Sequence, residues 1–370
     1  MKSSLLPLRA FAVVVVTIAC TFLASCKEEK SADTNVTVTT PPGNTAAVTT
    51  AFDKPLKPDG DIKIQIITNG ISPFWDAMQK GMEQMRGELK CDATRQSPSP
   101  PDNNAQKQVF DNAIAGQVNG IAVSPIQADA FGSVIDAAID KGVPVITFDS
   151  DSEKSKRLCY LGTNNFEAGK VAGQKAVELM PTGGKIVAFV GNMSAQNARD
   201  RFNGFMEGVK GHNIECLNGQ PFEDDKDVGR ARRNVGDAIT KFGGKINGFL
   251  GLYSYNGPAI VNEVEAKGLL HKVKIICFDG EPATLKNLEA GKVDVTVVQK
   301  PYEFGRLCTK LLYLTNRKGF KAAIDEMKPE LETMGMKVNG QIIDTGVDVI
   351  TPQNAKEFLK KLKEKGLEST

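Results

Sequence analysis

The sequence predicts an α/β protein with two doubly wound parallel-sheet lobes. Its clearest support is a repeat, because residues 143–150, VPVITFDS, return as residues 273–280, VKIICFDG. The tripeptides NGI at residues 119–121 and NGF at residues 247–249 form a second pair, one upstream of each copy. A β-branched run without alternating polarity is typical of a strand that is buried on both faces, as in a parallel sheet. Two copies of such a strand therefore predict two similar lobes.

Strands and helices alternate along the first lobe. The apolar run from Ile62 to Thr68 predicts the opening strand, and the turn NGISP leads into a helix over residues 74–89. Apolar residues four positions apart predict two further helices, one through Val109 and one through Ile135. The remaining strands of this lobe are expected at residues 120–124, 143–148 and 159–161.

The alternation restarts at Asn164 and predicts the second lobe. A last strand near residues 342–350 precedes a C-terminal helix, residues 353–370, in which several apolar residues share one face. Repeated strand-helix units favour parallel sheets that carry helices on both faces. The expected helices cover residues 166–179, 198–209, 231–239, 258–267 and 302–314, and the expected strands cover residues 185–190 and 293–298 and lie near residues 214, 248 and 275.

The N-terminal residues predict export. Two basic residues precede a short apolar run, residues 10–18, which is too short for a membrane span of about 20 residues. Residues 23–26, LASC, resemble the bacterial lipobox, in which the cysteine is lipidated and becomes the mature N-terminus. We therefore expect residues 1–25 to be a signal peptide and Cys26 to carry a lipid anchor. A plain secretory signal is the alternative.

A change of composition follows the signal. Residues 26–60 are rich in Thr, Ala, Pro, Ser and Asn and hold too few apolar residues to build a core, so we expect a disordered tether. Its root-mean-square reach is about 30–35 Å. The predicted location is the periplasm or the cell surface, with the protein anchored to the membrane by its lipid. The rest of the chain is long enough for two domains of ordinary size.

Composition argues against several classes of function. The net charge is +2, with 46 basic and 44 acidic side chains, so no basic surface for nucleic acid is predicted. The chain has two histidines, His212 and His271, and neither a phosphate-binding glycine loop nor a nucleophile elbow. We therefore expect that the protein is not an enzyme and that it has neither a cofactor nor a metal site. Five cysteines follow Cys26 without a CxxC motif, and the sequence leaves their pairing open.

A few side chains at the ends of predicted strands favour a binding site. Asp149 and Asp279 end the two repeated strands, at the edge where open α/β sheets bind ligands, although aspartate also caps helices. Phe74 and Trp75 follow the turn after the first strand, where they could stack on a ligand or pack in the core. Arg199 stands at the start of a helix and could either contact the ligand or be solvated at the surface.

Six segments resemble the sugar-binding proteins of bacterial ABC importers, most closely the ribose-binding branch of the type I periplasmic-binding fold. They are SPFW (72–75), SPIQAD (124–129), VITFD (145–149), ARDR (198–201), FDG (278–280) and QKPYEFG (299–305). The likeness covers about residues 62–349. The resemblance implies a ligand site at Ser72, Phe74, Trp75, Ser124, Asp149, Arg199, Asp224, Tyr255, Asp279 and Gln299.

Four positions depart from the pattern of the ribose binders. Ser124 and Tyr255 stand at or near positions that hold asparagine in those proteins, and Ser150 replaces an arginine. Asp224 lies near a usual phenylalanine. The resemblance therefore implies a sugar site without implying ribose.

The resemblance also implies three crossings between the lobes, near Thr163, Lys300 and Asp344, and a hinge closure that traps the ligand. The expected first lobe comprises residues 61–163 and 300–343, and the expected second lobe comprises residues 164–299 and 344–352.

The implied function is capture of a small neutral monosaccharide and its delivery to the permease subunits of an ABC importer. The protein is expected to act as a monomer and to have no nucleic-acid partner. Two alternatives keep the same fold. In one, the protein presents its ligand to a signalling partner. In the other, it binds an amino acid-like ligand, with Arg199 holding a carboxylate and the aspartates holding an ammonium group.

Overall fold

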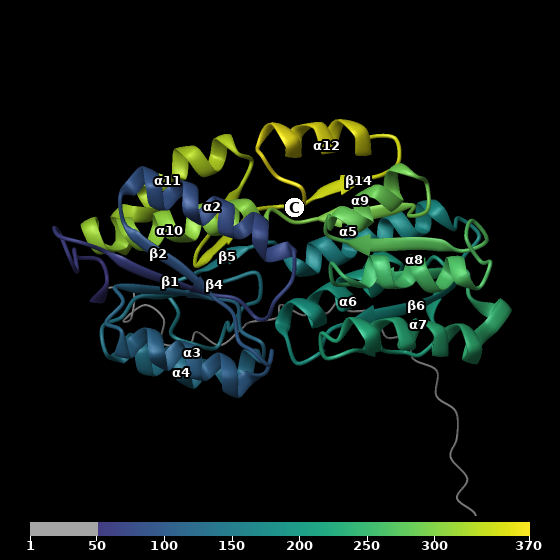
Figure 1. Ribbon diagram of the computed structural model, residues 1–370, viewed down its shortest axis with the longest axis horizontal. Coiled ribbons are helices and arrows are strands. Elements are labelled where there is room, and N and C mark those ends of the chain that lie inside the picture. Colours follow the sequence, from purple (N-terminus) through teal and green to yellow (C-terminus); the bar gives the residue numbers. More distant parts are fainter. Residues whose placement is uncertain (1–50) are drawn as a thin grey trace, which may run out of the picture. The chain divides into compact units, whose positions relative to one another are not determined.

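Two parallel sheets, one in each lobe, form the core of the structure (Figure 1). The computed structural model describes residues 51–370, which all lie within one compact unit of the chain, Gly43–Thr370. The predicted signal peptide, Cys26 and most of the predicted tether lie outside the described residues. Among residues 51–370, no helix combines the length and the apolar character that a membrane span requires.

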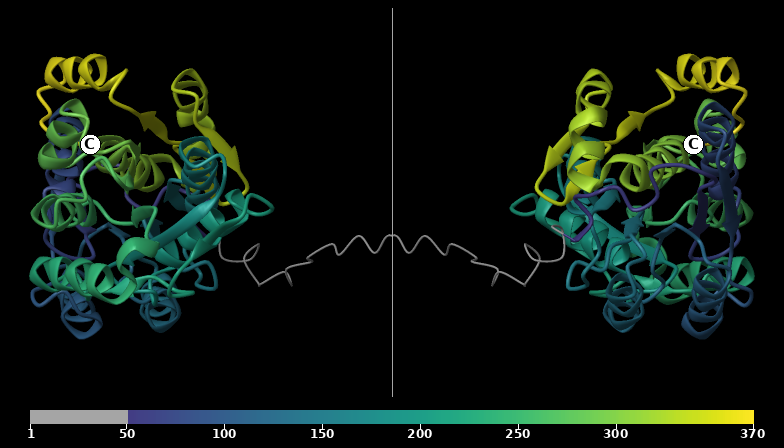
Figure 2. Two further views of the ribbon diagram at one scale, coloured as in Figure 1. Left: turned by 90° about the vertical axis from the view of Figure 1, so that its right-hand side faces the viewer. Right: turned by 90° about the vertical axis from the view of Figure 1, so that its left-hand side faces the viewer.

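The first lobe holds a seven-stranded sheet in the order β12-β13-β5-β4-β3-β1-β2. All neighbours run parallel except β12 and β13, which form an antiparallel edge. Every side chain of β3 and β4 is buried, because helices cover both faces of the sheet (Figures 1 and 2). The strands are β1 (Lys63–Ile67), β2 (Asp92–Gln96), β3 (Gly120–Val123), β4 (Val145–Phe148), β5 (Tyr160–Gly162), β12 (Lys337–Asn339) and β13 (Ile342–Asp344), and the helices are α2 (Phe74–Leu89), α3 (Asn103–Ala115), α4 (Ala128–Asp140), α10 (Pro301–Lys318) and α11 (Phe320–Thr333).

The second lobe repeats this plan in the order β14-β11-β10-β9-β6-β7, with the short β8 paired to β6. Only β14 runs antiparallel, against β11. The α/β fold with two parallel-sheet lobes is thus confirmed. The strands are β6 (Gly184–Val190), β7 (Ile214–Cys216), β8 (Phe222–Glu223), β9 (Gly248–Gly251), β10 (Lys274–Phe278), β11 (Val295–Val298) and β14 (Asp348–Ile350), and the helices are α5 (Asn165–Leu179), α6 (Gln196–Gly208), α7 (Val228–Phe242), the 3-10 turn η1 (Gly243–Lys245), α8 (Asn256–Ala266), α9 (Pro282–Glu289) and α12 (Ala355–Glu364).

The repeated strands occupy the same place in both sheets. β4 lies between β5 and β3, and β10 lies between β11 and β9. Asn119 and Asn247 also play matching parts, since the Oδ1 of each accepts a 2.9 Å hydrogen bond from the backbone N–H of Lys63 or Lys185 on the neighbouring strand. The repeat in the sequence therefore encodes two copies of one sheet topology.

In each lobe two helices cross where glycines face each other. A Cβ added at Gly81 of α2 would lie 1.9 Å from the carbonyl oxygen of Tyr302 in α10, and one at Gly305 of α10 would lie equally close to the backbone of α2. Helices α5 and α6 repeat the arrangement, because a Cβ at Gly204 would lie 1.9 Å from the carbonyl oxygen of Phe166. Only a residue without Cβ allows the two backbones to come this close.

The chain passes between the sheets three times. It leaves the first sheet after β5, returns after β11 to form α10, which packs on α2, and leaves again between β13 and β14. The prediction of one strand near residues 342–350 is therefore wrong. Two short strands in different sheets replace it, because Gly346 takes a positive φ of 67° and turns the chain between them.

Residues 51–60 belong to the folded body, so the predicted tether is too long at its C-terminal end. Phe52 is 2% exposed and lies in the core of the first lobe. Its carbonyl oxygen accepts a 2.7 Å hydrogen bond from the N–H of Phe320, and the N–H of Leu56 donates to the carbonyl oxygen of Asn316 at 3.0 Å. One aromatic residue anchors this segment, although its composition is mostly polar.

The C-terminal segment, residues 353–370, contacts both lobes. It carries α12, which lies at the edge of the molecule in both side views (Figure 2). Leu362 and Leu367 share an apolar cluster with Ala77 of α2 in the first lobe and Leu285 of α9 in the second. The segment thus joins the lobes in addition to the three chain crossings.

The last residues of this segment rest beside the loop that follows β10. The N–H of Gly280 donates a 2.8 Å hydrogen bond to the Oγ1 of Thr370, and the N–H of Thr370 donates back to the carbonyl oxygen of Gly280 at 3.2 Å. Ser369 and Thr370 are both buried. Thr370 therefore contacts Gly280, the residue that directly follows Asp279.

Candidate functional site

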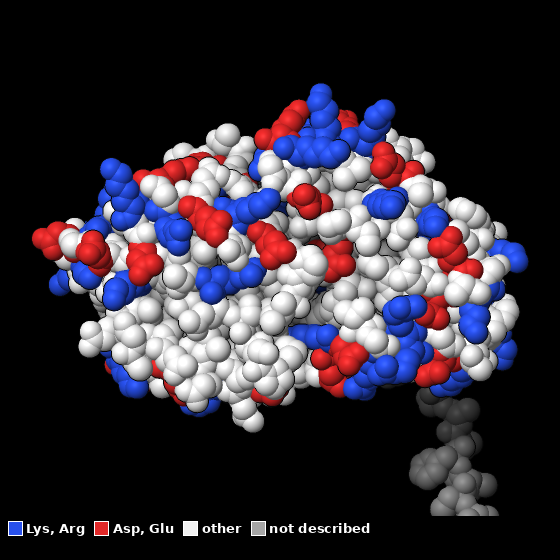
Figure 3. Space-filling view, viewed as in Figure 1, with Lys and Arg blue, Asp and Glu red and all other residues white. Residues whose placement is uncertain are grey.

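A cavity of about 370 Å³ lies between the lobes and is lined by residues that follow strands of both sheets. A hollow near the centre of the face in Figure 3 marks the gap between the two lobes. Of the ten predicted site residues, seven line the cavity, namely Ser72, Phe74, Trp75, Asp149, Tyr255, Asp279 and Gln299. Ser124, Arg199 and Asp224 do not line it.

The two repeated aspartates face the cavity from opposite lobes. Asp149 follows β4 with a φ of +59°, and Asp279 follows β10 with a φ of +65°. This left-handed conformation is rare outside glycine and is found in matching places after both repeated strands. The Oδ2 of Asp149 accepts hydrogen bonds from Ser124 Oγ at 2.7 Å and from the Nδ2 atoms of Asn69 and Asn197 at 3.3 Å. Asn197 belongs to the second lobe, so one carboxylate already connects both sides of the cavity.

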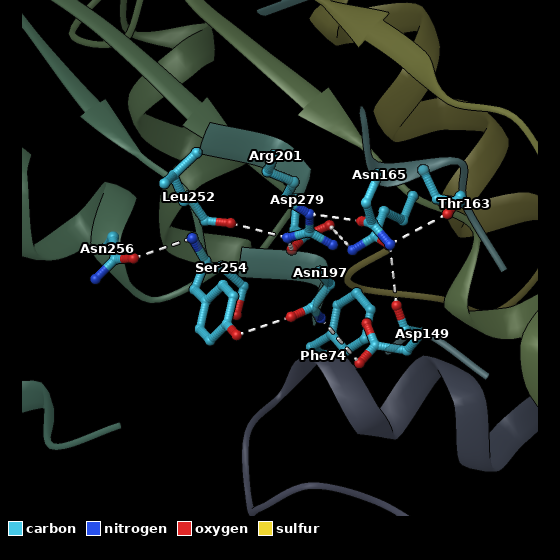
Figure 4. Close-up of polar contacts among 12 residues, drawn as sticks. Phe74, Asp149, Thr163, Asn165, Asn197, Arg201, Leu252, Ser254, Asn256 and Asp279 are labelled. Atoms are coloured by element: carbon cyan, nitrogen blue, oxygen red, sulfur yellow. Dashed lines mark hydrogen bonds and ion pairs between the residues drawn. The ribbon is translucent and has the colours of Figure 1, made fainter. Parts of the chain in front are cut away.

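Arg201 is the arginine of the cleft. It is 1% exposed, and its guanidinium donates from Nε to Asn165 Oδ1 and from Nη1 to the carbonyl oxygen of Leu252, both at 2.8 Å (Figure 4). Its carbon Cζ lies 4.8 Å from the centre of the Phe278 ring. Nη1 is also 3.9 Å from Asp279 Oδ2. The positive charge is thus fixed in place beside the second aspartate.

Arg199, a predicted ligand-binding residue, does not line this cavity. Its guanidinium donates to the carbonyl oxygens of Met193 and Ser194 at 3.1 and 2.7 Å. In α6 the buried residues include Ala198, Arg201 and Phe205, which share one face of the helix. Residue 199 lies outside this stripe. The apolar spacing in the sequence could therefore have identified Arg201 instead.

Two polar atoms at the cavity have no partner among the described residues. They are Nη2 of Arg201 and Oε1 of Gln299, and both are buried. The other end of the Gln299 amide donates from Nε2 to Asp279 Oδ1 at 3.0 Å, which sets its orientation. Buried polar atoms are nearly always hydrogen-bonded in folded proteins. One vacant donor and one vacant acceptor beside Asp279 are what a small polar ligand would complete.

Aromatic side chains form another wall of the cavity. Phe74 and Trp75 begin α2 and meet edge to face, with ring centres 4.8 Å apart. Trp75 also packs edge to face against Phe148 at 5.8 Å, so the core and the cavity share this ring. From the second lobe, Tyr253 lines the cavity and its hydroxyl donates to Asn197 Oδ1 at 2.9 Å.

Asp224 and Ser124 support cavity residues and do not face the cavity themselves. Asp224 is fully buried and accepts hydrogen bonds from the hydroxyl of Tyr255 at 2.6 Å and from Asn256 Nδ2 at 2.9 Å. Ser124 lies behind Asp149. In the structure, Asp224 positions Tyr255 and Ser124 positions Asp149.

Several cavity residues were missed by the sequence analysis. Asn69 lies two residues beyond β1 and Glu281 two residues beyond Asp279, so their positions after strands could have identified both. Lys226 carries no such signal. It sits in the loop after β8 with a φ of +66°, and its Nζ reaches across the cleft to donate to the carbonyl oxygen of Asn69 at 2.6 Å.

Burial changes the acidity of the cleft. It raises the pKa of Asp149 to about 6, although the charge of Arg201 and the hydrogen bond from Ser124 act to lower it. Burial likewise raises the pKa of Asp279, again opposed by Arg201. The pKa of Lys226 is lowered to about 8 by burial, against the pull of nearby carboxylates. The Asp149 carboxyl and the Lys226 amine therefore both change charge within about one to two pH units of neutrality.

Ligand binding should weaken as the pH falls below 6. A ligand that donates hydrogen bonds to the Asp149 carboxylate needs that group ionised, and the group takes up a proton near its pKa of about 6. The Kd should then rise by about tenfold for each pH unit below this value, because one proton must be released on binding. Isothermal titration calorimetry between pH 5 and about 7.5 checks this expectation.

Asp149→Asn is the matched variant, since it removes the titrating proton and should bind weakly with a flatter pH profile. A wild-type Kd that stays constant from pH 5 to about 7 would contradict the assignment. The raised pKa acts differently on the stability of the unliganded protein. Its contribution is fully present below the ordinary value of 3.8 and is lost as the pH rises through about 6.

From residue 51 onward, no group of three or more His, Cys, Asp or Glu side chains is arranged so that it could hold a metal ion. The five cysteines of these residues are all free thiols. The chemistry available in the cleft is therefore hydrogen bonding to carboxylates, amides and an arginine, together with aromatic contact.

Comparison with known proteins shows that this chain is similar to periplasmic binding proteins. The periplasmic binding protein domain family matches residues 64–318. The ribose import binding protein RbsB of Haemophilus influenzae is 24% identical over 237 residues, which are 64% of this chain and 79% of that protein. The xylose/arabinose-binding protein XylF of Sulfolobus acidocaldarius is 24% identical over 307 residues, 78% of this chain and 70% of that protein. An ABC transporter solute binding protein from Burkholderia graminis, solved in complex with D-arabinose, superposes with a TM-score of 0.69 and 26% identity, covering 81% of this chain and 98% of that one.

Proposed function

Because this chain belongs to the periplasmic binding protein family, we propose that it is the substrate-binding component of an ABC importer and captures a small neutral carbohydrate. The relatives named above are binding proteins for ribose, xylose or arabinose, and a solute binding protein that holds D-arabinose. The family is extracytoplasmic and is a family of binding proteins, so the chain acts by binding and not by catalysis.

The single observation that carries the proposal is the group of polar side chains Asp149, Asp279, Arg201 and Gln299 in the cleft, which we call the polar floor. Asp149 and Asp279 present carboxylates from opposite lobes, and the vacant atoms of Arg201 and Gln299 lie beside the second one. Vicinal hydroxyls of a sugar can donate to a carboxylate and accept from an arginine at the same time. The rings of Phe74 and Trp75 offer apolar surface for the C–H face of a sugar ring.

The energetics are sufficient for a useful affinity. A micromolar site requires about −8 kcal/mol. Charge-assisted hydrogen bonds contribute roughly 1.5–3 kcal/mol each. Bonds to Asp149, Asp279 and Arg201, with burial against aromatic rings, supply this after the cost of association. Closure of the lobes removes water from these bonds, which strengthens them.

The alternative of an amino acid-like ligand has less support. It requires an arginine that is free to hold a carboxylate, and the residue assigned to that task, Arg199, donates to backbone carbonyl oxygens and does not line the cavity. Arg201 already donates to two protein acceptors and lies 3.9 Å from Asp279. Only its Nη2 is unpartnered, so Arg201 cannot make the bidentate pair that an arginine usually forms with a carboxylate.

We assign export and lipidation to the N-terminal residues as part of the same proposal. The supporting observation is the tetrad LASC, which places a cysteine at position 26 after a short apolar run. Delivery to a permease is supported by two of the named relatives, an import binding protein and an ABC transporter solute binding protein. Cell fractionation tests the anchor, because Cys26→Ser should move the protein from the membrane to the soluble fraction.

A thermal-shift panel tests the proposed ligand class. The full chain is heated with pentoses and hexoses, with amino acids as controls. A sugar present at about 100 times its Kd stabilises the folded state by about 2.7 kcal/mol, which gives a clear rise in Tm. A response to one or a few sugars is expected. A response to amino acids alone would replace the sugar assignment with the alternative.

A further inference from the structure

The mouth of the cleft is apolar, whereas its floor is polar. Ile71 of the first lobe and Val228 of the second line the cavity, yet their exposed fractions are 78% and 53%. Pro98 and Pro101 of the first lobe and Pro258 of the second also line it. We call these five residues the collar. Two of the few exposed large apolar side chains in residues 51–370 thus stand at one opening, on opposite lobes.

The two lobes approach each other beside the collar. A Cβ added at Gly70 would lie 3.3 Å from the Cβ of Pro101 and 3.7 Å from the Cδ of Lys226 on the opposite lobe. The Nζ of Lys226 is held by the carbonyl oxygen of Asn69 at 2.6 Å, so its aliphatic stem adds to the apolar surface between the lobes. Uncharged surface also predominates on the first-lobe side of the hollow in Figure 3.

The size of the cavity exceeds the needs of the polar floor. A volume of about 370 Å³ corresponds to about a dozen water molecules at about 30 Å³ each. The atoms of a single sugar ring are bonded and therefore pack more closely than water. A free monosaccharide held by Asp149, Asp279 and Arg201 would leave the exposed side chains of Ile71 and Val228 in contact with water, so these side chains would contribute nothing to binding.

We infer that the ligand is a glycoside, in which the floor binds the sugar ring and the collar holds an apolar substituent such as an alkyl or aryl group. This inference rests on the proposed function, because it takes the floor to be a sugar site. A protein partner over the mouth is the competing occupant. The ligand is favoured because Ile71 and Val228 line the same cavity as the floor. Proline rings also present rigid C–H faces that suit an aryl group.

Paired titrations of free sugars and their phenyl glycosides test the inference. The full chain is titrated by calorimetry with D-ribose, D-arabinose, D-xylose and D-glucose, and with the phenyl α- and β-glycoside of each. At least one phenyl glycoside should bind about tenfold or more tightly than its free sugar, because the collar removes the phenyl group from water. The Ile71→Ser/Val228→Ser double variant should lose most of this ratio. Ile342→Ser, an exposed apolar residue outside the cavity, should keep it.

Three outcomes would overturn the inference, and they are distinguishable. Free sugars that bind as tightly as every phenyl glycoside would remove the collar from recognition and leave sugar binding intact. Equal losses for free sugar and glycoside in the double variant would assign Ile71 and Val228 to lobe closure instead. If neither sugars nor glycosides bind, the proposed sugar site itself fails, and the collar inference fails with it.

Discussion

Arg201→Met should abolish ligand binding, whereas Arg199→Met should leave it almost unchanged. Arg201 is buried and keeps one unpartnered nitrogen at the cavity. Its charge also opposes the rise in pKa that burial causes at Asp149 and Asp279. Its loss removes a charge-assisted bond of about 1.5–3 kcal/mol and favours protonation of Asp149 and Asp279. Together these effects should raise the Kd by at least about a hundredfold, as measured by calorimetry.

Arg199 provides the matched control, two residues away on the same helix. Its bonds go to backbone carbonyl oxygens outside the cleft, so a change in Kd of less than about threefold is expected for Arg199→Met. Arg201→Lys keeps the charge and separates a loss of binding from a loss of folding, which circular dichroism monitors. Normal binding by Arg201→Met, or loss of binding by Arg199→Met in a folded protein, would refute the placement of the cleft arginine.

Gly81→Ala should destabilise the first lobe strongly. The new methyl group would lie 1.9 Å from the carbonyl oxygen of Tyr302, so α2 and α10 would have to move apart. Overpacking against rigid backbone costs about 3 kcal/mol or more. A loss of this size is measured as a shift in the urea midpoint, with the change in slope as a check on two-state behaviour.

Gly87→Ala is the control within the same helix. A Cβ at Gly87 meets nothing within 4 Å, so the substitution should stabilise the protein by about 0.5–1 kcal/mol through helix propensity alone. The change in the free energy of unfolding should therefore have opposite signs for Gly81→Ala and Gly87→Ala, two substitutions in the same helix. A destabilisation of less than about 1 kcal/mol at Gly81 would mean that the helices separate easily, against the close crossing described above.

The sequence repeat was sufficient to predict the architecture because it lies in strands that have neighbours on both sides in each sheet. β4 and β10 are central strands whose side chains are almost all buried, so their composition reports the sheet directly. The aspartates after them could be placed because the carboxyl end of a parallel strand has a fixed relation to the sheet edge. Gly81 and Gly204 lie within two predicted helices, but the sequence does not indicate which helix packs against each of them.

Other features depend on tertiary contacts that a local pattern does not contain. β2 has the sequence DATRQ, with only Ala93 buried, and becomes a strand through pairing with β1. Neither this strand nor α11 was predicted. Lys226 reaches the cleft through a loop conformation with positive φ, for which lysine gives no signal. The phase of α6, by contrast, was available from the spacing of Ala198 and Phe205 and would have selected Arg201.

The burial of Ser369 and Thr370 has a practical consequence for labelling this protein. Thr370 exchanges hydrogen bonds with Gly280, which directly follows Asp279 in the cleft. An affinity tag or fluorescent reporter fused after Thr370 would have to pull Ser369 and Thr370 out of their buried positions. The fused protein would then report on an altered ligand site. For a biosensor built on this scaffold, exposed loops remote from the cleft are the better points of attachment.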